Sequence, residues 1–170
     1  MKRLVLLGGG HAHVGVLADL AHRPLDNWEV HLVSPYRRQI YSGMLPGWIA
    51  GHHPIDDCAI ALDRLAARAG LVFHETAASG LDLERDTVQC ADGRTLRFDA
   101  LSIDTGPMPA LEGLPGSAEH GLPVRPIERF IEAWPALVDR IAGPGRHFHL
   151  LLLGAGAAGS DLACAIQHRA

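Results

Sequence analysis

The sequence predicts an α/β fold, in which helices cover a parallel sheet and a small antiparallel β-meander is attached to it. Two apolar runs predict the parallel part, residues 4 to 7 and 148 to 153, because each ends in a glycine cluster followed by apolar residues at helical spacing. The meander is predicted by short strand patterns around Val88 and Leu96, with the turn Ala91-Asp92-Gly93 between them. Together these patterns are typical of a nucleotide-binding α/β protein.

The first 33 residues predict a β-α-β unit. Residues 4 to 7 form the first strand, apolar residues recur from Val14 at the spacing of one helix face, and residues 28 to 33 form the second strand. Two parallel strands joined through a helix are expected to have a right-handed crossover.

The segment from Ser34 to Pro54 is rich in glycine and proline among aromatic residues, which indicates a binding loop rather than a packed element. A helix is then expected, with Asp56 or Asp57 as its cap and Gly70 at its end. Its apolar face contains Leu62, Leu65, Ala66 and Ala69. A third parallel strand follows at residues 71 to 74.

The last part of the chain predicts a strand at residues 100 to 103, followed by Asp104-Thr105-Gly106-Pro107 and a proline-rich connection. A helical stripe follows, which Pro135 is expected to kink or restart. The stripe consists of Ile127, Phe130, Ile131 and Trp134. Residues 148 to 153 are expected to form a buried strand before the second glycine cluster.

Composition excludes several classes of protein. The chain has 170 residues and a net charge of -4 with no basic run, so nucleic acid is not expected as a partner. No apolar stretch reaches the roughly 20 residues that span a bilayer, and no signal peptide is recognised, so a cytoplasmic protein is expected. Cys58, Cys90 and Cys164 are far apart, which favours neither a disulfide framework nor a redox pair.

The second glycine cluster is the stronger motif, because Gly154, Gly156 and Gly159 complete a G-x-G-x-x-G between an apolar run and an apolar helix. The first glycine permits the tight turn, the second lets a pyrophosphate approach the backbone, and the third allows close packing of helix on strand. The acid that normally binds the ribose lies about 20 residues further on. Only 11 residues follow Gly159, so this second fold is expected to be unfinished.

The first cluster keeps Gly8 and Gly10 but has His13 where the third glycine is expected. At the end of the second strand, Ser34 replaces the expected acid. For both clusters the alternative is a strand-to-helix connection that needs glycine only for its backbone. Two such clusters in one chain, separated by a hairpin and a strand that ends in Thr-Gly, favour nucleotide binding.

These motifs resemble those of the pyridine nucleotide-disulfide oxidoreductase superfamily, which includes type II NADH dehydrogenases and sulfide:quinone reductases. The resemblance covers nearly the whole chain. It rests on L-V-L-L-G-G-G-H-A-H at residues 4 to 13, L-S-I-D-T-G-P-M-P at 101 to 109 and L-L-L-G-A-G-A-A-G-S-D-L-A at 151 to 163. It implies a Rossmann-like FAD/NAD(P)-binding fold, with FAD and NAD(P)H as cofactors.

The resemblance also implies the site residues. The FAD pyrophosphate is expected over Gly8, Gly10, His11 and Ala12, the adenosine near Ser34 and Pro35, and the flavin near Thr105 and Gly106. For NAD(P) it implies Gly154, Gly156, Gly159 and Asp161, the last at a position where relatives usually carry a glutamate. No catalytic acid or base is expected, since the cofactors carry the hydride chemistry.

The expected domains are an FAD-binding part at 1 to 109, a connection and helix at 110 to 145, and the start of an NAD(P)-binding domain at 146 to 170. The implied activity is hydride transfer from nicotinamide to flavin and on to a quinone or another small-molecule acceptor. This chain alone is expected to be an inactive N-terminal fragment. A peripheral membrane contact beyond residue 170 and a homodimer are further expectations.

The segment S-P-Y-R-R-Q-I-Y-S-G-M-L-P-G-W-I-A-G-H at residues 34 to 52 is similar to a narrower bacterial group. That group is the NADH dehydrogenase-like domain found alone or fused to selenide, water dikinase. The rival hypothesis is a non-catalytic module that binds one adenine nucleotide on the first turn. The missing ribose acid and His13 favour that rival.

Other residues leave alternatives open. The pairs His11/His13 and His52/His53 suggest a metal, but no Cys, Asp or Glu completes a ligand set, so none is expected. Arg37 and Arg38 either contact a phosphate or belong to a solvated loop. The aromatic residues Tyr36, Tyr41 and Trp48 either flank the flavin or cover the core.

Overall fold

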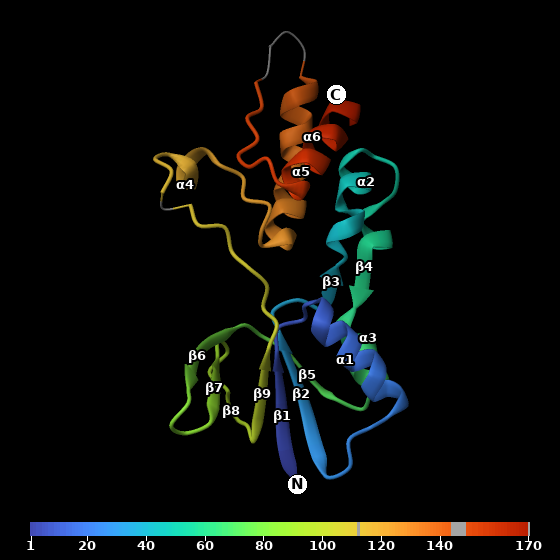
Figure 1. Cartoon of the computed structure of the whole chain (residues 1–170), viewed down its shortest axis with the longest axis vertical. Helices are drawn as coiled ribbons and strands as arrows, with labels where there is room; N and C mark the ends of the chain where they lie inside the picture. The colour runs from blue at the N-terminus through green and yellow to red at the C-terminus, as the bar shows by residue number, and fades with distance from the viewer. Residues whose placement is uncertain (112, 144–148, 170) are drawn as a thin grey trace. The chain divides into compact units, whose positions relative to one another are not determined.

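The computed structural model describes residues 1–111, 113–143 and 149–169. The chain divides into two compact units (Figure 1). The first unit contains residues 1–39 and 59–106, and the second contains residues 40–58 and 107–170. Each unit therefore combines segments that are separated in the sequence.

Seventeen elements make up the described part of the chain. The first unit contains the strands and helices β1 Lys2–Leu7, α1 His11–His22, β2 Trp28–Ser34, β4 Ala59–Ala61, α3 Leu62–Arg68, β5 Val72–Glu75, β6 Ala78–Asp82, β7 Thr87–Cys90, β8 Thr95–Arg97 and β9 Ala100–Ile103. The second unit contains η1 Ser42–Met44, α2 Leu45–Ile49, η2 Ile55–Cys58, α4 Ser117–His120, α5 Ile127–Ala142 and α6 Ala157–Arg169. Strand β3 Arg38–Ile40 lies where the chain passes from one unit to the other.

The first unit is built on a four-stranded parallel sheet with the order β5-β2-β1-β9. Strand β1 pairs with β2 from Lys2↔Trp28 to Leu7↔Val33, so both strands end at the same edge. Val5 and Leu6 of β1 are almost completely buried, which explains why this strand is apolar on both sides. The predicted β-α-β unit with its parallel sheet is confirmed.

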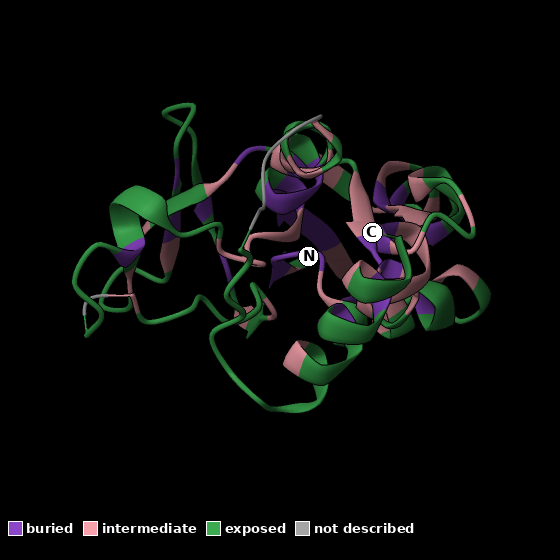
Figure 2. Cartoon of the chain, turned by 90° about the horizontal axis from the view of Figure 1, so that it is seen from above, coloured by how far each residue is buried: buried purple, intermediate pink, exposed green. Residues whose placement is uncertain are grey.

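The two faces of this sheet are covered by different layers (Figure 1). On one face Leu6 and Leu32 pack with Leu17 of α1 and Leu62 of α3. On the other face the alternate residues of β1 and β2 pack with the meander β6-β7-β8. That second cluster contains Val5, Leu7, Val33, Val88, Cys90, Leu96 and Phe98. Buried positions are shown in purple in Figure 2.

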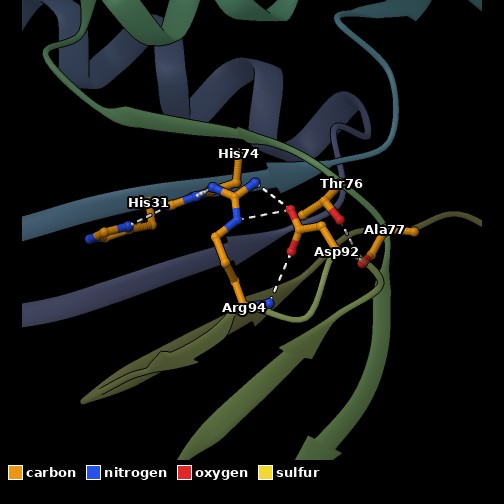
Figure 3. A network of polar contacts seen from close by, with 6 residues as sticks. All are labelled: His31, His74, Thr76, Ala77, Asp92 and Arg94. Atoms are coloured by element: carbon orange, nitrogen blue, oxygen red, sulfur yellow. Dashed lines mark hydrogen bonds and ion pairs between the residues drawn. The ribbon is translucent and has the colours of Figure 1, made fainter.

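A polar network of two buried histidines and an exposed Arg94–Asp92 pair joins the sheet to the meander (Figure 3). His31 Nδ1 of β2 lies 2.8 Å from His74 Nε2 of β5. His74 Nδ1 lies 2.9 Å from Arg94 Nη1 in the β7-β8 turn, and Arg94 is paired with Asp92. The hydrogen bonds from Arg94 lower the pKa of Asp92 to about 2. The meander is thus held by directed polar contacts as well as by apolar packing.

The donors and acceptors fix the ring protons of both histidines. Arg94 only donates, so His74 Nδ1 accepts and His74 Nε2 carries the proton. His74 Nε2 then donates to His31 Nδ1, which leaves the His31 proton on Nε2. That atom lies 3.1 Å from Glu29 Oε2, outside good hydrogen-bond geometry. Both rings are therefore neutral in this arrangement.

The region after β2 differs from the irregular loop that the sequence predicts. Residues 38 to 61 contain β3, η1, α2, η2 and β4, and β3 pairs with β4 in a two-stranded sheet. The expected cap by Asp56 or Asp57 is wrong, because those residues belong to η2 and a strand separates them from α3. Helix α3 begins after Ala61 without a side-chain cap.

The second unit is built around an aromatic cluster of Trp48, Phe130 and Trp134, with ring centroids 5.6 to 6.4 Å apart. Helix α5 contains Pro135 within a single element and does not restart there. The buried strand expected before the second glycine cluster is wrong for residues 149–153, which form no strand, and Leu151 is 81% exposed. Phe148 lies outside the described residues. No helix in the described ranges is long and apolar enough to cross a membrane.

Candidate functional site

The first glycine turn connects β1 to α1 at the carboxyl edge of the parallel sheet. Gly8 has φ +93°, a conformation that favours glycine, and its N–H donates to the Val33 carbonyl at 2.8 Å. Gly10 is the N-cap of α1 and has no side chain to bond the first amides. The first turn of α1 contains no acidic residue, and His11 and Ala12 are exposed there. The turn therefore lies at the positive end of a helix, a position that stabilises negative charge.

The segment after β9 lies directly against this turn. The Gly10 N–H donates to the Asp104 carbonyl at 3.1 Å, and the Asp104 N–H donates to the Leu7 carbonyl at 2.7 Å. A Cβ on Gly8 would overlap the Asp104 carbonyl and lie 2.7 Å from the Thr105 Cα. Residues 8 to 12 and 104 to 106, predicted separately from two motifs, are thus brought together at one edge of the sheet.

The carboxylate of Asp104 was not predicted as part of the turn. Its Oδ2 accepts the His13 N–H of α1 at 3.1 Å, and a Cβ on Gly10 would overlap the same carboxylate. Asp104 therefore performs the capping that Gly10 cannot. The sequence signal was its place directly before Thr105-Gly106, beside a strand that pairs with β1.

His13, which replaces the third glycine, is 2% exposed. Its Nδ1 lies 2.6 Å from the Gly8 carbonyl, and its Nε2 lies 2.9 Å from the Ser102 hydroxyl of β9. Because a carbonyl only accepts, Nδ1 donates and Nε2 accepts the Ser102 O–H. At this position a glycine would allow the helix to contact the strand directly. The His13 ring instead hydrogen-bonds α1 to the turn and to β9, so both of its nitrogens stabilise the turn and neither is a metal ligand here.

Ser34 is the last residue of β2, and Pro35 follows it at the same edge of the sheet. Ser34 is 4% exposed, and its hydroxyl donates to the Tyr36 carbonyl at 3.0 Å and accepts the Tyr36 N–H at 3.3 Å. Nearby, Arg37 Nε donates to Glu75 Oε2 at 2.7 Å, so this arginine is paired with an acid of β5. Ser34 closes a local turn, while Pro35 is exposed beside it.

The second glycine turn belongs to the second unit. Gly154 has φ +112°, and α6 begins at Ala157, as the motif predicts. A Cβ on Gly159 would overlap the Gly154 carbonyl, which is the close approach expected of the third glycine. A Cβ on Gly154 or Gly156 would meet nothing within 4 Å. Asp161 is exposed on α6.

The remaining sequence alternatives are resolved for several residues. Trp48 packs in the aromatic cluster of the second unit, whereas Tyr36 and Tyr41 are exposed. His52 Nε2 lies 3.1 Å from His168 Nε2. Across the described residues, no group of three or more His, Cys, Asp or Glu side chains is placed to hold a metal ion. Burial raises the pKa of the Cys58 and Cys90 thiols, so neither is activated for redox chemistry.

Comparison with known proteins gives a consistent structural likeness. No family model matches the chain. The chain is 24% identical over 144 residues to the sulfide-quinone reductase of Aquifex aeolicus (strain VF5). The matched region covers 85% of this chain and 33% of that protein. The solved structure of the sulfide:quinone oxidoreductase from Aquifex aeolicus matches with a TM-score of 0.68, 24% identity and the same two coverages.

Other solved oxidoreductases match more of the chain. The NAD-dependent persulfide reductase from A. fulgidus has a TM-score of 0.78 and 21% identity, covering 98% of this chain and 32% of its own. The water-forming NADH oxidase from Lactobacillus brevis has a TM-score of 0.77 and 16% identity, covering 99% and 38%. The chain thus spans about a third of the length of these relatives. The predicted Rossmann-like fold is confirmed.

Proposed function

We propose that this chain, whose fold is that of the pyridine nucleotide-disulfide oxidoreductase superfamily, forms the FAD-binding part of an NAD(P)H oxidoreductase. The relatives are reductases or oxidases, which supports the general class. The domain limits at 109 and 145 are part of this proposal, as is the similarity of residues 34 to 52 to the domain fused to selenide, water dikinase.

One observation carries the proposal. The glycine turn at residues 8 to 12 and the Thr105-Gly106 segment are 90 or more residues apart in the sequence, yet they meet at the carboxyl edge of the parallel sheet. In α/β sheets this edge is where dinucleotides bind. If the glycines were needed only for a local turn, nothing would require the Thr105-Gly106 segment to lie beside them.

The residues present fit the diphosphate of FAD. Gly8 and Gly10 add no side chain of their own at the mouth of α1, where the Asp104 carboxylate accepts the His13 N–H, and the backbone of His11 and Ala12 lies at the exposed start of that helix. Asp104 and His13 hold the turn in shape through their bonds to α1, Gly8 and Ser102. These contacts preorganise the amides, so less order has to be gained on binding.

The chemistry of the reaction would come from the cofactor, because bound FAD supplies hydride acceptance from NAD(P)H and electron transfer onward. Thr105 and Gly106 would lie at the flavin side of the turn, and Ser34 and Pro35 at the adenosine side. For the nicotinamide nucleotide we propose Gly154, Gly156, Gly159 and Asp161. None of these residues has to act as an acid or base.

A quinone is the acceptor that we propose, since the curated relative is a sulfide-quinone reductase. Peripheral contact with the cytoplasmic face of a membrane would follow from a lipid-soluble acceptor, and a homodimer is compatible with this scheme. The second candidate function is a non-catalytic adenine-nucleotide module. Ser34 favours this second function, because it stands in place of a ribose-binding acid and its hydroxyl is hydrogen-bonded to the backbone of Tyr36.

Spectroscopy of the protein purified from its native source separates the two functions. An oxidoreductase should be yellow, with the flavin absorption bands, and NADH or NADPH should bleach these bands when oxygen is excluded. A quinone analogue should then restore them. A protein that binds ADP but takes up no flavin would support the non-catalytic module and contradict our proposal.

A further inference from the structure

The carboxyl edge of the parallel sheet shows which side chains can reach an adenosine on the first turn. The strand order β5-β2-β1-β9 places the glycine turn after β1, Ser34 at the end of β2, and Glu75 at the end of β5. Asp104, after β9, is on the opposite side of the glycine turn from β2 and accepts the His13 N–H of α1. The adenosine side of this edge is therefore lined by Ser34 and Glu75.

Ser34 is poorly suited to bind ribose hydroxyls. Its hydroxyl donates to the Tyr36 carbonyl and accepts the Tyr36 N–H, and the residue is 4% exposed. An incoming hydroxyl would have to break this turn. The carboxylate expected at this position in a dinucleotide fold must therefore come from another residue.

The position of Glu75 beside Ser34 makes its side chain the candidate for this carboxylate. Glu75 is paired in register with Ser34, and the Thr76 N–H donates to the Ser34 carbonyl at 3.0 Å. Neighbouring strands lie about 4.8 Å apart, and paired residues of a parallel sheet point to the same face, so a glutamate side chain spans the gap between them. The side chain of Glu75 is 44% exposed, which leaves its carboxylate accessible to a ligand.

Arg37 fixes the carboxylate in place. Its Nε donates to Glu75 Oε2 at 2.7 Å from the segment that follows Pro35. The bond orders the long glutamate side chain before any ligand arrives, and it leaves Oε1 and the second lone pair of Oε2 as acceptors. Two hydroxyl groups on adjacent ribose carbons match such a pair of acceptor oxygens.

We propose that Glu75, held by Arg37, hydrogen-bonds the 2′- and 3′-hydroxyls of the adenosine ribose bound at the first glycine turn. Glu75 on β5 thus supplies the carboxylate that Ser34 on β2 lacks. The inference rests on the proposed function, since it requires an adenine nucleotide at this turn. It also removes the observation that favours the non-catalytic module, because the ribose contact is moved rather than lost.

The test compares ADP with 2′,3′-dideoxy-ADP by isothermal titration of the protein freed of any bound cofactor. In the wild type, loss of the hydroxyls should weaken binding about tenfold or more, the range for hydrogen bonds to a charged group. In Glu75→Gln the two ligands should differ by about threefold or less. Glu84→Gln changes an exposed glutamate on the β6-β7 turn and should keep the wild-type ratio.

Arg37→Gln separates the carboxylate from its ion pair. It removes the same salt bridge but keeps Glu75, so most of the preference for the ribose hydroxyls should remain. Equal losses in Arg37→Gln and Glu75→Gln would assign the effect to the ion pair and overturn the inference. If the wild type binds ADP with no preference for the hydroxyls, the inference alone fails. If it binds neither ligand, the proposed function fails with it.

Discussion

Sequence and structure rank the two glycine turns of this chain in opposite order. The second turn matches the sequence motif better, but the first turn is better packed. The second has the full G-x-G-x-x-G spacing, yet a Cβ on Gly154 or Gly156 would meet nothing within 4 Å, and residues 149–153 before it form no strand. The first lacks the third glycine, yet Gly8 and Gly10 are each enclosed by the Asp104 segment, and Val5, Leu6 and Leu7 at the end of the strand before them are buried.

Motif spacing therefore specifies only the local turn. Whether the turn can form a binding site depends on the strands that pack around it. The first turn lies between β2 and β9, which supply Val33 and Asp104 as partners of Gly8 and Gly10. Within the described residues, the second turn has the α6 start and the Gly159 contact but no paired strand. Four predictions test how the two regions differ.

The largest difference is expected between the segments that precede the two turns, which are β1 and residues 149–153. Leu6 is 1% exposed, so Leu6→Ala should lower the free energy of unfolding by about 4 kcal/mol through lost burial and a cavity. Leu151 is 81% exposed, and Leu151→Ala should change it by less than about 0.5 kcal/mol. Urea unfolding followed by circular dichroism measures both. Equal losses would show that the segment before the second turn is as well packed as β1.

The first glycines of the two turns should also differ. Gly8→Ala forces a side chain into a positive φ and onto the Asp104 carbonyl, so it should cost about 3 kcal/mol. Gly154→Ala has the same kind of strain without the overlap and should cost about 1 to 2 kcal/mol. The same unfolding experiment compares them. A larger cost at Gly154 would contradict the structural ranking of the turns.

The first unit should lose stability as the pH falls below about 6.5. Burial, and then His31 and Arg94, lower the pKa of His74, so near pH 6.5 the unfolded chain takes up a proton that the folded chain resists. Stability is therefore present above this pH and is lost below it. The charged or titratable groups that act on the His74 ring are Arg3, His31, Asp92 and Arg94.

His74→Gln should flatten this dependence when unfolding free energies are compared at pH 8, 7, 6 and 5. His120→Gln is the matched control, because that histidine is exposed on α4 in the second unit. An unchanged slope in His74→Gln would mean that other groups cause the loss of stability.

The smallest effect is expected at Gly15, inside α1. A Cβ there would meet nothing within 4 Å, so Gly15→Ala should stabilise the protein by about 0.5 to 1 kcal/mol through helix propensity. Thermal unfolding measures the shift in Tm. A loss of stability would show that α1 is packed more closely than the structure has it.

The parts predicted from sequence are those governed by local patterns. The glycine turns, the β-α-β unit, the meander and β9 all follow from apolar periodicity and turn residues close in the sequence. The turn's partners could not be predicted in this way, because Asp104 reaches α1 across 91 residues and the His13 ring reaches Ser102 across 89. Such contacts depend on strand order, which no local pattern specifies.

Two of the departures from the sequence-based expectations have related causes. Residues 38 to 61 form short elements because β3 finds β4 as a partner about 20 residues later, and this pairing outweighs their glycine and proline content. Residues 149–153 have a strand pattern but no paired strand among the described residues, and an isolated strand gains no ladder hydrogen bonds. In both cases the presence or absence of a paired strand determines whether a strand forms.

The central claim is that the first turn, and not the second, binds the diphosphate of FAD. Titration of the isotope-labelled protein with FAD, followed through its backbone amide NMR signals, tests this most directly. Our account predicts the largest shifts at residues 8 to 13 and 104 to 106. Absence of binding, or shifts confined to residues 154 to 161, would contradict it.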